Sequence, residues 1–131
     1  MKKVIYTKNA PEPVGPYSQA ILADNFLYCS GQIAINPETN EFIDGTIEEQ
    51  TEQIIKNIEA LLKEADFSMN DIIKTTCFLE NMEDFSKFNE IYAKYFVSNP
   101  ARSCVEAKLP KGAKAEIEVI ANKKPQSVEL M

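Results

Sequence analysis

The chain has 131 residues, of which 44% are apolar, and it carries a net charge of −6 with a pI near 4.7. This length predicts one domain that buries a core of its own. The acidic charge disfavours nucleic-acid binding, because nucleic-acid binders usually present a basic surface to the phosphates. Histidine is absent from the sequence, which excludes Ser-His-Asp, Cys-His and HExxH chemistry and removes the commonest zinc ligand.

The cysteines and the apolar runs indicate a protein of a reducing compartment. Three widely spaced cysteines, Cys29, Cys77 and Cys104, are an odd number and are expected to be free thiols. The start, residues 1–3, leads into a short apolar run, so we expect no signal peptide. Each apolar run is far shorter than the roughly 18 residues of a membrane span. We therefore expect a cytoplasmic protein that enters no membrane and needs no metal or disulfide.

Three strands are predicted in the N-terminal part, at residues 4–6, 19–22 and 26–35. A proline-rich loop at 9–16 separates the first two. Gly31 interrupts the third strand, where a glycine often marks a bulge or a close approach to the backbone. Gly31 is therefore a candidate site residue.

A helix is predicted from Thr46 to about Ala65, followed by a buried strand at 72–79. Thr46 and Glu49 have the spacing of a capping box, in which each side chain bonds the other residue's backbone N–H. The apolar residues of the helix fall on one stripe, which indicates one core-facing and one solvated side.

A second helix is predicted over residues 81–97, with an aromatic face directed at the core. Asn89 falls on this face, because it lies four residues after Phe85 and three before Tyr92. A buried amide without a partner costs about 1–3 kcal/mol. On spacing alone, Asn89 is expected to tie down a nearby loop backbone.

Two strands close the chain, at residues 101–107 and 115–121. Arg102 is the single arginine among 14 cationic side chains. A guanidinium matches a carboxylate through two hydrogen bonds, which indicates either an oxyanion to hold or a structural ion pair. If the two strands pair as a hairpin, Arg102 and Glu116 can share a face, as a salt bridge or as a polar site within reach of one ligand.

Five segments stand in order along the chain: Gly15-Pro16-Tyr17-Ser18, Ser30-Gly31-Gln32, Lys74 to Leu79, Pro100 to Glu106, and Leu109 to Ala113 leading into Glu116-Ile117-Glu118. Together they closely resemble the RidA (YjgF-type) family of reactive-intermediate deaminases. We take residues 1–122 as one RidA-like domain. The remaining residues, 123–131, are expected to be a frayed tail or one added by cloning.

The resemblance implies an α+β fold like that of chorismate mutase, a mixed sheet with two helices on one face. It also implies a homotrimer with a central barrel-like core and a site in each cleft between subunits. The activity it implies is the hydrolysis of reactive 2-imino acids, 2-iminobutanoate and 2-iminopropanoate, to 2-oxo acids and ammonium. Such chemistry needs no cofactor, because water attacks the imine carbon without one.

The resemblance also implies roles for individual residues. Arg102 would bind the substrate carboxylate, and Glu116 would orient the attacking water. Further contacts to the ligand are implied at Tyr17, Ser30, Gly31, Asn89 and Cys104. Cys104 has no histidine to activate it, and an imine needs no covalent intermediate, so its main chain is the expected contributor.

Some assignments stay open on sequence. Glu118 is expected to be a structural partner, although it could exchange roles with Glu116. Ile33, Ile35 and Phe88 are predicted walls of the pocket. Asp66 stands where many members of the family have glycine, and we expect it to adopt the left-handed cap conformation at small cost.

Two other functions are open as alternatives. A non-catalytic module could use the same arginine to sense 2-oxo acids or other small carboxylates. An RNA-cleaving or translation-blocking role is disfavoured by the acidic pI.

Overall fold

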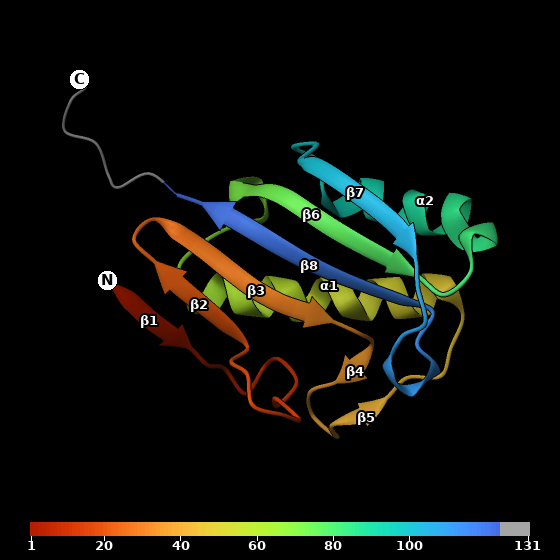
Figure 1. Ribbon diagram of the computed structural model, residues 1–131, viewed down its shortest axis with the longest axis horizontal. Helices are drawn as coiled ribbons and strands as arrows, with labels where there is room; N and C mark the ends of the chain where they lie inside the picture. Colours follow the sequence, from red (N-terminus) through yellow and green to blue (C-terminus); the bar gives the residue numbers. More distant parts are fainter. Residues whose placement is uncertain (124–131) are drawn as a thin grey trace.

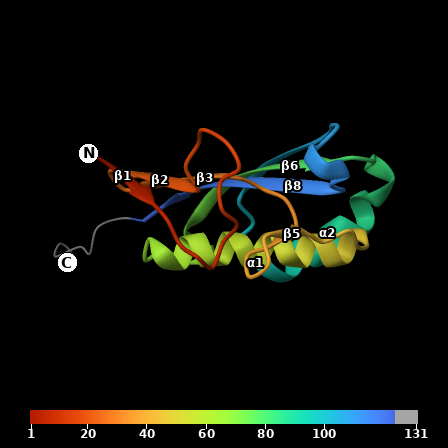
Figure 2. The same cartoon turned by 90° about the horizontal axis from the view of Figure 1, so that it is seen from below.

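In the computed structural model, which describes residues 1–123, two helices cover one face of a six-stranded sheet (Figures 1 and 2). This arrangement confirms the predicted α+β class. The predicted tail, apart from Lys123, lies outside the described residues. Within those residues no helix is long and apolar enough to cross a membrane.

The sheet contains, in spatial order, β1 (Lys2–Ile5), β2 (Ala20–Ala23), β3 (Phe26–Gln32), β8 (Ala115–Asn122), β6 (Ile72–Leu79) and β7 (Ala101–Glu106). All neighbouring strands are antiparallel except β6 and β7, which run parallel. A separate pair is formed by β4 (Ile35–Asn36) and β5 (Glu41–Phe42). The helices are α1 (Ile47–Glu64) and α2 (Phe85–Tyr95), and short 3-10 turns occupy Met69–Asp71, Met82–Asp84 and Pro110–Gly112.

The first helix begins and ends where the sequence predicts. The Thr46 side chain accepts a hydrogen bond from the Glu49 N–H at 3.1 Å, and Glu49 Oε1 accepts one from the Thr46 N–H at 2.8 Å. This confirms the capping box. After the helix, Asp66 has a φ of 66°, the left-handed conformation that was expected there.

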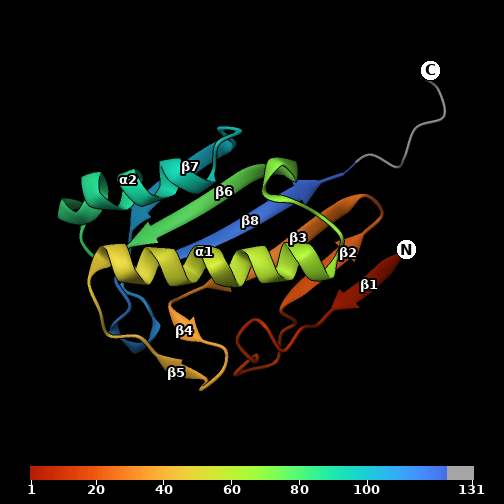
Figure 3. The same cartoon turned by 180° about the vertical axis from the view of Figure 1, so that it is seen from behind.

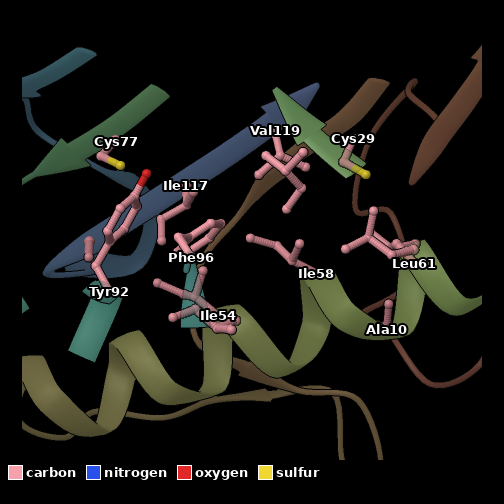
Figure 4. Close-up of a cluster of buried hydrophobic side chains, with 14 of the residues drawn as sticks. Ala10, Cys29, Ile54, Ile58, Leu61, Cys77, Tyr92, Phe96, Ile117 and Val119 are labelled. Carbon is pink, nitrogen blue, oxygen red and sulfur yellow. The ribbon is translucent and has the colours of Figure 1, made fainter. Parts of the chain in front are cut away.

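The core lies between the sheet and the two helices (Figure 3). Alternate residues of β8 point into it, and Ile117 and Val119 meet Ile54 and Ile58 of α1 there (Figure 4). Because successive residues of a strand point to opposite faces, Glu116 and its neighbour at 118 point away from the helices.

The second helix is shorter than predicted, since residues 82–84 form a 3-10 turn and α2 ends at Tyr95. Its inner side packs Phe88, Tyr92 and Phe96 into the core, with the rings of Tyr92 and Phe96 stacked 4.2 Å apart. Phe88 is fully buried, so its prediction as a pocket wall is wrong.

The last two strands do not pair as the hairpin considered from the sequence. β7 pairs in parallel with β6, with Arg102 beside Thr75, and β8 lies on the other side of β6, with Glu116 beside Phe78. The α2 crossover returns the chain parallel to β6. β8, whose buried face is apolar along its whole length, takes the central place over α1. In this topology Arg102 and Glu116 of one chain cannot lie on the same face of the sheet.

Candidate functional site

The predicted site residues fall into two groups that lie on opposite faces of the sheet. We call the first the arginine cluster, which consists of Arg102 on β7 and three α2 side chains, Phe85, Asn89 and Tyr92. The second, which we call the carboxylate cavity, is the cavity of about 520 Å³ that Glu116 lines together with Tyr17, Ser30, Gly31 and other residues.

The arginine cluster holds the guanidinium through one hydrogen bond and two rings. Nη1 of Arg102 donates to Oδ1 of Asn89 at 2.7 Å. The guanidinium carbon lies 4.8 Å from the ring centre of Tyr92 and 5.4 Å from that of Phe85, within the range of cation–π attraction. Asn89 therefore positions the Arg102 side chain, and the prediction that it bonds a loop backbone is wrong.

Arg102 has no carboxylate partner among residues 1–123. The ion pairs in this part of the chain join the N-terminus to Asp24 and Lys123 to Asp66. The intramolecular structural ion pair considered for Arg102 is therefore not present in the described residues. A partly buried guanidinium with a neutral amide as its anchor keeps its charge available for an external anion.

Tyr92, one of the two rings that contact the Arg102 guanidinium, is itself held by a buried hydrogen bond. The hydroxyl of Tyr92 and that of Thr75 on β6 are hydrogen-bonded at 2.7 Å in a buried environment. Burial raises the pKa of Tyr92, so its hydroxyl stays protonated. The aromatic stripe of α2 was visible in the sequence, but its contact with Arg102 was not.

Cys104 lies two residues beyond Arg102 on β7 and packs against the core. Burial raises the pKa of its thiol, and the positive charge of Arg102 opposes this effect only in part. The neutral thiol is a poor nucleophile. The side chain thus offers no support for covalent catalysis.

The carboxylate cavity is bounded by the loop between β1 and β2, the end of β3, the Pro110–Gly112 turn and β8. Ile33 and Ile35 line it, as predicted. Glu12 and Lys111 also line it, and neither was identified from the sequence, because Glu12 stands in a loop without a distinguishing pattern and the segment that contains Lys111 implied no role for it.

Gly31 brings the backbone of β3 against the carboxylate of Glu116. The pairing of β3 with β8 shifts register between Cys29 and Gln32, which confirms a bulge at this glycine. A side-chain Cβ at Gly31 would overlap Oε2 of Glu116. Burial, and secondly the negative charge of Glu118, raise the pKa of Glu116.

Tyr17 and Ser30 belong to the cavity in different ways. The Tyr17 ring is half exposed, and its hydroxyl accepts a hydrogen bond from the Val14 N–H at 3.3 Å. The Ser30 hydroxyl donates to the Ser18 carbonyl at 2.6 Å. Ser30 thus attaches the loop to the sheet, while Tyr17 faces the cavity from that loop.

Known proteins resemble this chain over nearly its whole length. The family model described as Endoribonuclease L-PSP matches residues 7–123. A RutC family protein from Pyrococcus horikoshii is 55% identical over 125 residues, 94% of this chain and 99% of that protein.

Solved structures show the same fold. A Rid family protein, YyfA from Yersinia pestis, superposes with a TM-score of 0.91 at 52% identity, covering 94% of this chain and all of that one. TdcF from E. coli, solved with bound serine, gives 0.89 at 37% identity, covering 93% and 99%. These matches confirm the predicted RidA-type resemblance and its chorismate-mutase-like fold. The chain belongs to the endoribonuclease L-PSP family, the group that includes the RutC, YjgF and Rid proteins.

Proposed function

We propose that the protein is a hydrolytic deaminase of small 2-imino acids, including 2-iminobutanoate and 2-iminopropanoate. The observation that carries this proposal is the anchored guanidinium of Arg102, which has no carboxylate partner among the described residues. A 2-imino acid supplies the missing carboxylate. TdcF, a relative of this chain, was solved with bound serine, which is a small ligand with the same group.

The site is completed by two copies of the chain. Arg102 and Glu116 lie on opposite faces of one sheet, so one ligand reaches both only when the arginine cluster of one copy meets the carboxylate cavity of another. The helix-free face also exposes Val4, Tyr28 and Val105, each about half accessible. Exposed apolar side chains of this kind favour burial in an interface, in keeping with the homotrimer that the family resemblance implies.

In the reaction, Arg102 binds the carboxylate through charge-assisted hydrogen bonds worth about 1.5–3 kcal/mol. Glu116 holds a water against the imine carbon and accepts its proton as the C–O bond forms. Glu116 passes this proton on to the nitrogen of the resulting carbinolamine, and as the hydroxyl gives its own proton back to Glu116 the C–N bond breaks, ammonia leaves and the 2-oxo acid remains. The raised pKa makes Glu116 a stronger base toward the attacking water than an exposed carboxylate would be.

An RNA-cleaving role, suggested by the family description, finds less support in this cavity. Glu12, Glu116 and Glu118 line it, against the single cation of Lys111. Three carboxylates repel a phosphate backbone. A non-catalytic sensor of 2-oxo acids would share the arginine clamp but would not turn over an imine, and turnover therefore distinguishes it.

The proposal is tested by trapping the imine. A threonine dehydratase generates 2-iminobutanoate, semicarbazide captures it, and the protein is added as wild type, Arg102→Lys, Glu116→Gln or the surface control Glu90→Gln. We expect wild type and the control to suppress semicarbazone formation and the two site variants to fail with their fold intact. A wild type that suppresses nothing rejects the deaminase and leaves the carboxylate sensor. RNA cleavage by the wild type that Glu116→Gln abolishes would support the nuclease instead.

Mixing the two site variants tests where the site lies. When Arg102→Lys and Glu116→Gln chains are unfolded together and reassembled in equal amounts, a site between copies becomes intact whenever its arginine and its glutamate come from the complementary variants. Random assembly then restores about a quarter of wild-type activity. A site contained in one chain would give no recovery.

A further inference from the structure

The loop between β1 and β2, one wall of the carboxylate cavity, has three of its carbonyls bonded by one buried amide side chain. Gln19 is 2% exposed and directly precedes β2. Its Oε1 accepts from the Thr7 N–H at 2.8 Å. Its Nε2 donates to the carbonyls of Thr7, Ala10 and Pro11 at 3.0, 3.2 and 2.9 Å.

The loop depends on this side chain because it lacks a strand partner. Residues 7–18 lie between two strands that pair with each other, and the three prolines at positions 11, 13 and 16 have no N–H to donate. Backbone carbonyls that face the protein interior must still find donors. One amide side chain supplies them at three positions along the loop.

The same residue joins the loop to the bulge of β3. The Gln19 carbonyl accepts a hydrogen bond from the Ser30 N–H at 2.9 Å, and the Ser30 hydroxyl donates to the preceding carbonyl, that of Ser18, at 2.6 Å. Gly31, which contacts Glu116, follows directly. Gln19 therefore lies between the loop that carries Tyr17 and the strand that supports the carboxylate.

We infer that Gln19 is a positioning residue, which holds loop 7–18 and through it places Tyr17 in the carboxylate cavity. The catalytic part of this inference, an effect on imine hydrolysis, rests on the proposed function. The structural part, an effect on the loop, rests on the hydrogen bonds alone. The role requires an amide. Leucine has a similar volume but no donor, and a glutamate at this place would direct its carboxylate at three carbonyl oxygens.

The test combines hydrogen exchange with a double-mutant cycle. Gln19→Leu, Tyr17→Ala, the double variant and the core control Ile54→Val are compared, the last because a fully buried α1 side chain lowers stability without touching the loop. We expect Gln19→Leu to speed exchange of the amides in 7–18 by about tenfold or more, since several hydrogen bonds are lost at once. Exchange in α1 should change little.

The kinetic part of the test measures kcat/KM for imine hydrolysis by each variant. If Gln19 acts through Tyr17, the double variant loses no more activity than the more severe of its two single variants. The losses of kcat/KM caused by Ile54→Val and by Tyr17→Ala should instead multiply in the variant that carries both. Multiplicative losses for Gln19→Leu and Tyr17→Ala would overturn the inference, and so would unchanged loop exchange in Gln19→Leu.

Failure of the proposed function is distinguishable from failure of this inference. A wild type that hydrolyses no imine rejects the deaminase, while the exchange experiment still decides whether Gln19 holds the loop. The double-mutant cycle is then read from the Kd for 2-oxobutanoate. A coupled loss of affinity supports the placement of Tyr17 by Gln19, and independent losses, or no loss, overturn it.

Discussion

Arg102 donates from Nη1 to Oδ1 of Asn89 at 2.7 Å, so a neutral amide holds the one guanidinium of this chain. This relationship decides what the cation can do. A carboxylate at the same place would neutralise the charge, whereas an amide orients the guanidinium and leaves the charge to a ligand.

Replacing the amide by a carboxylate should therefore harm binding more than removing it. We expect Asn89→Asp to weaken 2-oxobutanoate binding by about tenfold or more, because the new carboxylate competes with the ligand for Arg102. Asn89→Ala should weaken it less. Isothermal titration calorimetry of both variants measures the difference, and an Asn89→Asp variant with wild-type affinity would contradict the assigned role of Arg102.

Gly31→Ala should separate activity from stability. The new Cβ would overlap the end of the Glu116 side chain, which is flexible and can move aside at a modest cost in stability. We expect imine hydrolysis to fall about as far as in Glu116→Gln, while Tm changes by only a few degrees. Gly15→Ala is the matched control, because a Cβ there makes only ordinary contacts, the nearest at 3.5 Å. Full activity of Gly31→Ala would show that the position of Glu116 does not matter.

Glu118→Gln should move the acid limb of the pH–rate profile. Burial and the charge of Glu118 both raise the pKa of Glu116, and removing that charge lowers it again. A base is active when ionised, so the acid limb of kcat/KM should shift toward lower pH with the plateau retained. Loss of activity at every pH would instead assign the water-orienting role to Glu118.

Thr75 and Tyr92, the hydrogen-bonded pair next to Arg102, should contribute to stability together and not independently. Thr75→Val leaves the Tyr92 hydroxyl without its partner and should cost about 1–3 kcal/mol in the free energy of unfolding. The double variant Thr75→Val with Tyr92→Phe removes both hydroxyls, and we expect it to be more stable than Thr75→Val alone. Urea denaturation gives these free energies, and a double variant less stable than Thr75→Val would contradict the buried hydrogen bond.

Local features were predictable because their causes lie within a few residues of each other. The capping box of Thr46 and Glu49 determines where α1 begins. The interruption at Gly31 marks a bulge, and the run at 72–79 forms a strand with the predicted bounds. The motifs in order along the chain were also sufficient for the family.

The sequence by itself thus determined most of the elements, the family and a set of candidate site residues. Only the tertiary structure decided which of them meet. Arg102 contacts Asn89 because the α2 crossover places β7 parallel to β6, and Glu116 faces away from both helices because β8 buries its alternate residues over α1. Strand pairing is a long-range choice governed by burial of whole faces. Spacing between neighbouring segments therefore could not reveal it.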